Sequence, residues 1–158
     1  MKFKETNLKG SFEHPVIRTD DAIMAVASEM LNAKTSILKK YDVSFQQYII
    51  LKTLYFTKGE SASIKSLTEE MFDRMSNTSR LVAKLEKKAF IKRKISDSDR
   101  RQVEIRITKE GEKIFIKGSL ALNEAIFTMY KSLGTRELDN LLETLLKLRR
   151  SKTVKKDM

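Results

Sequence analysis

Apolar residues recur every three or four positions through most of the chain, which is the spacing of an amphipathic α-helix. Ile23, Ala27, Met30 and Leu31 begin one such stripe, and the leucines from Leu138 onward form another near the end. The pattern predicts helices over about residues 19–40, 44–57, 77–88, 109–132 and 135–150, with a short helix after Ser63. The fold class that follows is mostly α.

The period changes from 3.6 to 2 in the middle of the chain. Two runs, 91–95 and 103–107, alternate isoleucine or valine with charged and polar residues. Such alternation puts the apolar side chains on one face of a strand. Residues 96–101, between the runs, are polar and read as a turn. The sequence therefore predicts a small β-hairpin with one apolar face.

The ends of the chain carry weaker patterns. Residues 1–18 are expected to form an irregular arm, because the residue before a proline is disfavoured in a helix and His14 precedes Pro15. Thr19 is then the predicted N-cap of the first helix, with acidic residues 20 and 21 in its first turn. Residues 151–158 are expected to form a basic, frayed tail.

Composition excludes several classes of function. The chain has no cysteine and one histidine, so thiolate zinc sites, multi-histidine metal centres and a Ser-His-Asp triad find no support. Five glycines form no phosphate-binding loop. Residues 1–10 lack the apolar stretch of a signal peptide, and the longest apolar run, 22–27, is far shorter than the about 18 residues of a membrane span. We expect a cytoplasmic protein that is not an enzyme and has no cofactor, metal or membrane partner.

Net charge points to a polyanionic partner. The chain carries 32 Lys and Arg against 21 Asp and Glu, a formal charge of +11. Residues 73–106 hold eleven of the basic residues and five of the acidic ones, so more than half of the excess lies in this segment. The segment spans the predicted helix 77–88 and the hairpin, and a basic cluster on such a unit favours nucleic acid.

The order helix, short helix, turn, helix and hairpin is that of a winged helix-turn-helix, here over about residues 44–108. At 100° per residue, the helix after the turn buries Thr78, Leu81, Val82 and Leu85 and turns a basic, polar face outward. The predicted DNA-binding residues of this recognition helix are Ser76, Asn77, Ser79, Arg80, Lys84 and Lys87, with small Ala83 between them. Those predicted in the wing are Lys92, Lys94, Asp99, Arg100 and Arg101.

Five segments resemble the multiple antibiotic resistance regulator (MarR) family of bacterial transcription factors. They are Leu67–Met71, Ser79–Val82, Leu85–Lys88, Asp97–Arg101 and Ile107–Gly111, in the order and spacing of that family. Asp99 and Arg101 match its wing-tip motif, and Thr108 and Gly111 match its motif after the wing. Ala89 departs from the pattern, because the family often has glycine there.

The resemblance implies a single domain over residues 19–150, in which helices 19–40 and 109–150 form a homodimer. The leucines of the last helix support this homodimer, since a small monomer cannot easily bury so many leucines on one helix. The alternative is that these leucines pack in the core of a single chain. The predicted dimer interface contains Leu138, Leu141, Leu142 and Leu145. Such a dimer would place two recognition helices about 34 Å apart on a pseudo-palindromic double-stranded DNA operator.

The resemblance also implies repression relieved by a small aromatic or phenolic effector. Six residues either line such a pocket or belong to the core: Met24, Met30, Tyr41, Phe45, Tyr48 and Tyr55. The sequence does not locate the effector pocket. The function that follows is sequence-specific regulation of transcription by a homodimeric repressor that a small-molecule effector relieves. The alternative is a winged-helix module that binds protein or structured RNA rather than an operator.

Overall fold

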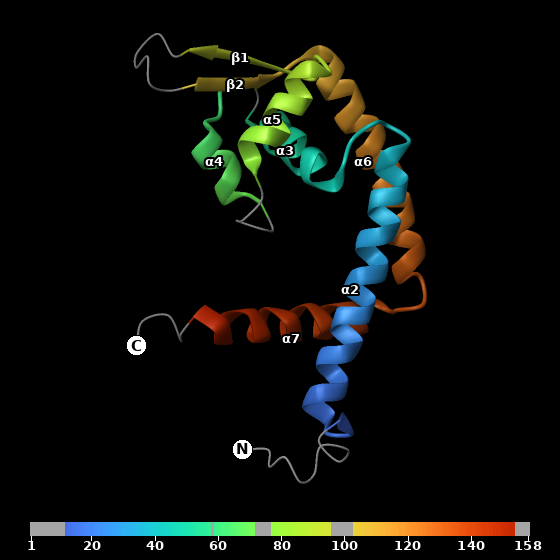
Figure 1. Cartoon of the computed structure of the whole chain (residues 1–158). Coiled ribbons are helices and arrows are strands. Elements are labelled where there is room, and N and C mark those ends of the chain that lie inside the picture. Colours follow the sequence, from blue (N-terminus) through green and yellow to red (C-terminus); the bar gives the residue numbers. More distant parts are fainter. Residues whose placement is uncertain (1–11, 58, 72–76, 96–102, 154–158) are drawn as a thin grey trace. The chain divides into compact units, whose positions relative to one another are not determined.

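The computed structural model describes residues 12–57, 59–71, 77–95 and 103–153. For residues 151–153 it describes the backbone alone. The chain divides into two compact units, residues 1–122 and residues 123–158. Six helices and two strands are named in order along the described part: α2, α3, α4, α5, β1, β2, α6 and α7 (Figure 1). The mostly helical fold with one hairpin agrees with the sequence prediction.

Helix α2 runs from Pro15 to Lys39 and begins earlier than predicted. Its N-cap is His14, whose Nδ1 accepts the N–H of Val16 at 3.2 Å, so the prediction of Thr19 as the cap is wrong. Pro15 occupies the first turn, where its fixed φ suits a helix and its missing N–H costs nothing. The prediction of an irregular arm is therefore wrong for residues 15–18, while residues 1–11 lie outside the described residues. The first turn of α2 contains no acidic residue.

Helices α3 (Phe45–Phe56) and α4 (Ile64–Glu69) both start at the predicted serines. Ser44 and Ser63 each form a capping box, in which the serine side chain accepts the N–H of the residue three positions on and that residue's side chain accepts the serine N–H. Helix α3 is the centre of the first unit, since Ile50, Leu51 and Leu54 are almost fully buried.

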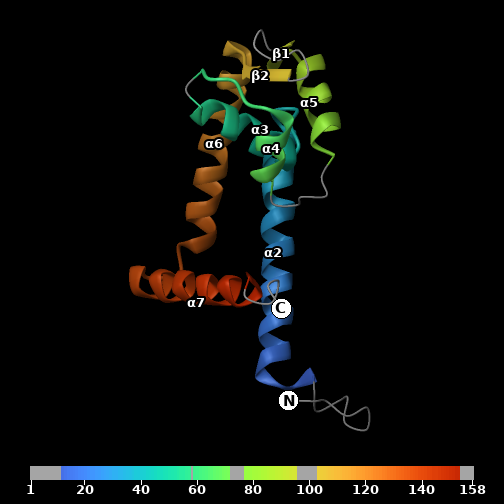
Figure 2. The same cartoon turned by 90° about the vertical axis from the view of Figure 1, so that its left-hand side faces the viewer.

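Helix α5 (Thr78–Lys87) contacts α3, α4 and β1 (Figures 1 and 2). Thr78, Val82 and Leu85 are buried, which confirms the predicted inner face. A hydrogen bond of 2.9 Å between the Thr78 and Thr68 hydroxyls joins α5 to α4. The predicted turn at 72–76 lies outside the described residues.

Strands β1 (Ile91–Ile95) and β2 (Val103–Ile107) pair antiparallel, with Ile91 opposite Ile107 and Ile95 opposite Val103. The strand bounds agree with the sequence pattern. Only the base of the apolar face is covered, because Ile105 is buried while Ile95 is 61% exposed. Ala62 adds a single bridge to β2, exchanging two hydrogen bonds of 2.9 Å with Ile105.

Helix α6 (Lys109–Tyr130) follows the hairpin and begins at the predicted cap, where the Thr108 hydroxyl accepts the N–H of Gly111 at 3.1 Å. The same hydroxyl donates to the carbonyl of Ala89 at 2.8 Å and so ties the start of α6 to the end of α5. Phe115 of α6 is buried, with its ring centroid 4.6 Å from that of Tyr55 and 5.5 Å from that of Tyr48.

The second unit contains the end of α6 and helix α7 (Thr135–Thr153). Gly134 separates the two helices as predicted, and its N–H is bonded to the Glu137 carboxylate at 2.8 Å. Helix α7 continues past residue 150 to Thr153, so the prediction of a frayed tail is wrong for residues 151–153, and residues 154–158 lie outside the described residues. Among the described helices, none is both long and apolar enough to cross a membrane.

Candidate nucleic-acid interface

The outward face of α5 carries cations on a helix whose other face is anchored in the core. Arg80, Lys84 and Lys87 are exposed, and Ala83 lies between them with its small side chain also exposed. None of the three cations forms an ion pair with a described residue. A rigid helix that presents unpaired positive charge can approach a polyanion closely.

The polar residues predicted at the start of this helix have different roles. Asn77 is exposed, but its side-chain oxygen accepts the N–H of Arg80 at 3.0 Å and caps α5. Its Nδ2 group therefore remains as the hydrogen-bond donor toward a ligand. Ser79 is exposed beside it, on the flank of the outward face. Ser76 lies outside the described residues.

An ion pair holds the wing against one flank of α5. Arg93 of β1 donates from Nε to Glu86 Oε2 at 2.7 Å, and its Nη2 bonds the same oxygen. These hydrogen bonds, with the positive charge of Arg93 added, lower the pKa of Glu86 below its ordinary value, and the same contact raises the pKa of Arg93. The pair joins β1 to α5 at a solvent-exposed position, where such contacts contribute modestly to stability.

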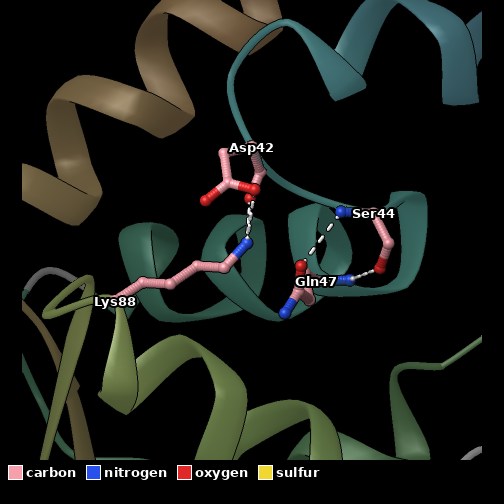
Figure 3. Close-up of polar contacts among 4 residues, drawn as sticks. All are labelled: Asp42, Ser44, Gln47 and Lys88. Carbon is pink, nitrogen blue, oxygen red and sulfur yellow. Dashed lines mark hydrogen bonds and ion pairs between the residues drawn. The ribbon is translucent and has the colours of Figure 1, made fainter.

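A second contact holds the opposite flank. Lys88, at the C-cap of α5, bonds the backbone oxygen of Asp42 and lies 2.9 Å from its Oδ1 (Figure 3). Asp42 precedes α3 and has a left-handed φ of 57°. Residues 86 and 88 point in opposite directions around a helix. The two contacts therefore limit rotation of α5 about its own axis.

The wing presents a charged outer face. Lys92 and Lys94 of β1 lie opposite Arg106 and Glu104 of β2, and both lysines are exposed. A groove of about 370 Å³ is lined by Lys92, Arg93, Lys94, Glu104 and Arg106. Arg106 is paired with Glu104 at 3.3 Å. The predicted wing-tip residues Asp99, Arg100 and Arg101 lie outside the described residues.

The leucines predicted at a dimer interface are on α7. Leu141, Leu142 and Leu145 are 41%, 58% and 39% exposed, and Leu138 is half-buried. Single exposed leucines are common on protein surfaces, so the dimer interface and the alternative of core packing within one chain both stay predictions.

The candidate effector residues divide into two groups. Tyr41, Phe45, Tyr48 and Tyr55 are partly buried and pack against the core of the first unit. The Tyr48 hydroxyl is 3.0 Å from the Ser119 hydroxyl. In contrast, Met24 is 64% exposed on α2, and Met30 is half-buried there. Packing against the core fits both readings of the four aromatic residues, so a role in an effector pocket stays a prediction.

Some features of this surface were missed at the sequence level. The ion pairs of Glu86 with Arg93 and of Lys88 with Asp42 join residues whose meeting depends on how helix and hairpin pack. The bridge between Ala62 and Ile105 gave no signal, because a single paired residue has no periodicity. The described residues hold no cluster of three or more acidic or histidine side chains able to bind a metal ion.

Comparisons with known proteins agree with this geometry. Residues 32–117 match the family described as "Transcriptional regulator SarA/Rot". Over 120 residues the chain is 29% identical to the HTH-type transcriptional regulator SarZ of Staphylococcus aureus. The aligned region covers 75% of this chain and 78% of SarZ.

Three solved structures have the same fold. The organohalide-sensing regulator RdhR-CbdbA1625, with 2,4-dichlorophenol bound, matches with a TM-score of 0.78 at 21% sequence identity. The superposition covers 96% of this chain and 86% of the RdhR-CbdbA1625 chain. The MepR–DNA complex of S. aureus has a TM-score of 0.72 at 20% identity, with coverages of 89% and 97%. MarR of E. coli has a TM-score of 0.67 at 18% identity, with coverages of 82% and 94%. The fold is therefore that of MarR-type winged-helix regulators, as the sequence motifs predicted.

Proposed function

The chain belongs to the SarA/Rot family of transcriptional regulators, and we propose that it binds double-stranded DNA as a homodimer and represses transcription until a small effector releases it. The observation that carries the DNA-binding proposal is the outward face of α5, where Arg80, Lys84 and Lys87 are exposed and lack ion pairs with described residues. MepR, which shares the fold, has been solved in complex with DNA.

The proposed contacts divide into two kinds. Arg80 and the Nδ2 group of Asn77 lie at the N-terminal end of α5, where a recognition helix reads base edges in the major groove. Lys84, Lys87, Lys92 and Lys94 are flexible point charges suited to phosphates, which fix position rather than sequence. Asp99, Arg100 and Arg101 complete the proposed wing contacts on the strength of the sequence motif alone.

The exposed leucine stripe of α7 supports the proposed homodimer. Burying Leu141, Leu142 and Leu145 against a second copy would remove apolar side chains from water, at about 1.5–3 kcal/mol for each fully buried leucine. A two-fold dimer presents two α5 helices and therefore favours a pseudo-palindromic operator. The effector is proposed as a small aromatic or phenolic molecule, a class to which the 2,4-dichlorophenol bound by RdhR-CbdbA1625 belongs.

Fluorescence anisotropy with DNA fragments selected from the source genome tests the interface. We expect Arg80→Ala to weaken binding to a selected fragment by at least tenfold and to reduce the preference over random DNA. Lys92→Ala should weaken both kinds of DNA about equally. The control is Lys117→Ala, an exposed lysine on α6 outside the proposed interface, which removes the same charge. Equal losses for Arg80→Ala and Lys117→Ala would refute the assignment of α5.

The salt dependence and a duplex RNA competitor separate DNA binding from the alternative interaction module. With roughly eight phosphate contacts per dimer, log K should fall with log salt at a slope of about −7. Duplex RNA should compete poorly, because the deep and narrow major groove of A-form RNA does not admit a helix. Equal competition by duplex RNA would favour the alternative module.

Sedimentation velocity tests the dimer. Replacing Leu142, the most exposed of the three leucines, with aspartate places a charge in the proposed interface and should give a monomer with weaker DNA binding. The control is Asn140→Asp on the same helix, an exposed residue outside the stripe. A Leu142→Asp chain that sediments like the unchanged protein would contradict the proposed interface.

A further inference from the structure

Helix α2 carries an apolar stripe that the core of the first unit does not cover. Of the described residues of α2, Leu38 alone is buried, and it lies near the C-terminal end of the helix. At 100° per residue, the stripe follows one side of α2 over residues 16–31. Its apolar members, here called the α2 stripe, are Val16, Ile17, Ile23, Met24, Ala27, Met30 and Leu31. Val16, Met24 and Leu31 are exposed, and an apolar stripe of this length marks a surface that packs against a partner.

One acidic residue lies in the middle of the α2 stripe. The residues three and four positions before and after Asp20 share its side of the helix and are all apolar: Val16, Ile17, Ile23 and Met24. Asp20 is exposed and forms no ion pair with a described residue. It lies beyond the first turn of α2, so attraction to the helix dipole does not account for it. Covering the stripe would bury this carboxylate, which then requires a cation opposite it.

The leucine stripe of α7 contains one charge of the opposite sign. The stripe consists of Leu138, Leu141, Leu142, Leu145, Leu146 and Leu148. Arg149 follows Leu145 by four positions and Leu146 by three, so it lies on the same side of α7. Arg149 is exposed, and its guanidinium forms no ion pair within the described part of the chain. The sequence places no acidic residue on the leucine stripe and no cation on the α2 stripe.

We propose that Asp20 of one copy of this chain pairs with Arg149 of a second copy, so that the leucine stripe of α7 packs against the α2 stripe of its partner. The inference rests on the proposed homodimer and names the charge pair that determines which helices meet in it. Packing either stripe against its own copy would bury two like charges without a partner, whereas packing α2 against α7 brings opposite charges together.

The symmetry of a homodimer and the geometry of the pair agree with this arrangement. An isologous dimer contains the contact twice, because a residue of each copy meets the same residue of the other. An arginine and a carboxylate form directed hydrogen bonds, which are stronger than those between neutral groups. A shift of one helix by a turn would leave both charges unpaired on apolar surfaces, so the pair also fixes the register of α7 along α2.

Charge reversal followed by sedimentation velocity tests the pair. Asp20→Arg and Arg149→Asp each bring two like charges together, and each should raise the dissociation constant of the dimer at least about tenfold. The matched controls are Glu29→Arg and Lys147→Asp, which make the same charge changes at exposed positions on the opposite sides of α2 and α7. Equal weakening by the reversals and by their controls would overturn the proposal.

Mixing the two reversed chains shows whether the pair forms between copies. An Asp20→Arg chain and an Arg149→Asp chain each repel a copy of themselves, but a heterodimer of the two contains two pairs of opposite charges. Native mass spectrometry separates the three dimers by mass, and the heterodimer should exceed the proportion expected for random exchange. If a chain with both reversals dimerises while the mixture shows no such excess, the pair forms within one chain and the proposal is overturned.

Two further measurements separate this proposal from folding and from the homodimer itself. If circular dichroism shows that a reversal unfolds the chain, Asp20→Asn and Arg149→Gln take its place in a double-mutant cycle on the dimer dissociation constant. Their losses should be non-additive, and additive losses would overturn the pair. Sedimentation of the unchanged chain tests the homodimer: a monomer would refute it, whereas a dimer that tolerates the reversals as well as the controls would refute the charge pair alone.

Discussion

The junction between α5 and β1 contains a residue in a costly conformation. Ala89 has a φ of 57°, in the left-handed region that favours glycine. It ends α5 in a Schellman motif, in which the N–H of Phe90 bonds the carbonyl of Leu85 at 3.0 Å and the N–H of Ala89 bonds that of Glu86 at 2.8 Å. This is the position where the MarR pattern often has glycine, so we expect Ala89→Gly to stabilise the protein.

The magnitude follows from two opposing effects. An alanine in the left-handed conformation costs about 1–2 kcal/mol relative to the right-handed one, a penalty that glycine does not have. Glycine loses about 0.5–1 kcal/mol more conformational entropy on folding. Ala89 is exposed, so its methyl group contributes little burial. The net stabilisation should be about 0.5–1 kcal/mol.

Urea unfolding followed by circular dichroism measures this difference at a fixed protein concentration. Ala89→Gly should raise the midpoint while leaving the slope m unchanged. The matched control is Ala83→Gly, an exposed alanine inside the same helix, where glycine should lower stability by about 1 kcal/mol. If both substitutions lower the midpoint by the same amount, the left-handed conformation of Ala89 carries no penalty and the reasoning fails.

Three more predictions concern two glycines of α6 and the ion pair between α5 and β1. A Cβ on Gly111 would lie 2.0 Å from the backbone oxygen of Phe90, so Gly111→Ala should cost at least about 3 kcal/mol by urea unfolding. Gly118→Ala should change stability by less than about 1 kcal/mol, because its new Cβ meets the flexible Leu38 side chain at 3.2 Å and the Tyr48 and Tyr41 side chains only at ordinary contact distances; equal losses would contradict this. The lowered pKa of Glu86 means that its pair with Arg93 stabilises the fold above the ordinary glutamate pKa and ceases to do so as the pH falls through the lowered value. The stability advantage over Glu86→Gln should therefore be full at pH 7 and vanish in strong acid, and an advantage that grew on acidification would refute the sign.

Local sequence pattern was sufficient for most elements of the winged helix. The change of period at residue 91 located the hairpin, and the serines at 44 and 63 located two helix starts because capping boxes involve residues only three apart. The start of α2 was mispredicted because Pro15 has two opposite effects. A proline disfavours helix for the residue before it, but it favours a helix that begins at its own position. His14, as a cap, uses a ring nitrogen in place of the more usual hydroxyl or carboxylate.

The sequence predicted which face of α5 and the wing is basic. It did not predict which of the basic side chains on that face are engaged in ion pairs. Counting eleven basic residues over 73–106 treats each as free to meet a polyanion. The structure shows that Lys88 and Arg93 are engaged with Asp42 and Glu86, which only tertiary packing brings within reach. Arg106 is engaged with Glu104, two residues away on the same face of β2.

Removing the paired cations changes what the charge count means for DNA binding. The lysines proposed to contact phosphates are Lys84, Lys87, Lys92 and Lys94, and the ion-paired Lys88, Arg93 and Arg106 are not among them. Four per protomer make eight in the proposed homodimer, and eight neutralised phosphates give the salt slope of about −7. The pairs of Glu86 and Lys88 have a different use, since they fix the rotation at which α5 presents those cations. A steeper slope would indicate that wing-tip residues Arg100 and Arg101 add contacts, whereas a slope near zero would mean that this face meets no phosphate backbone.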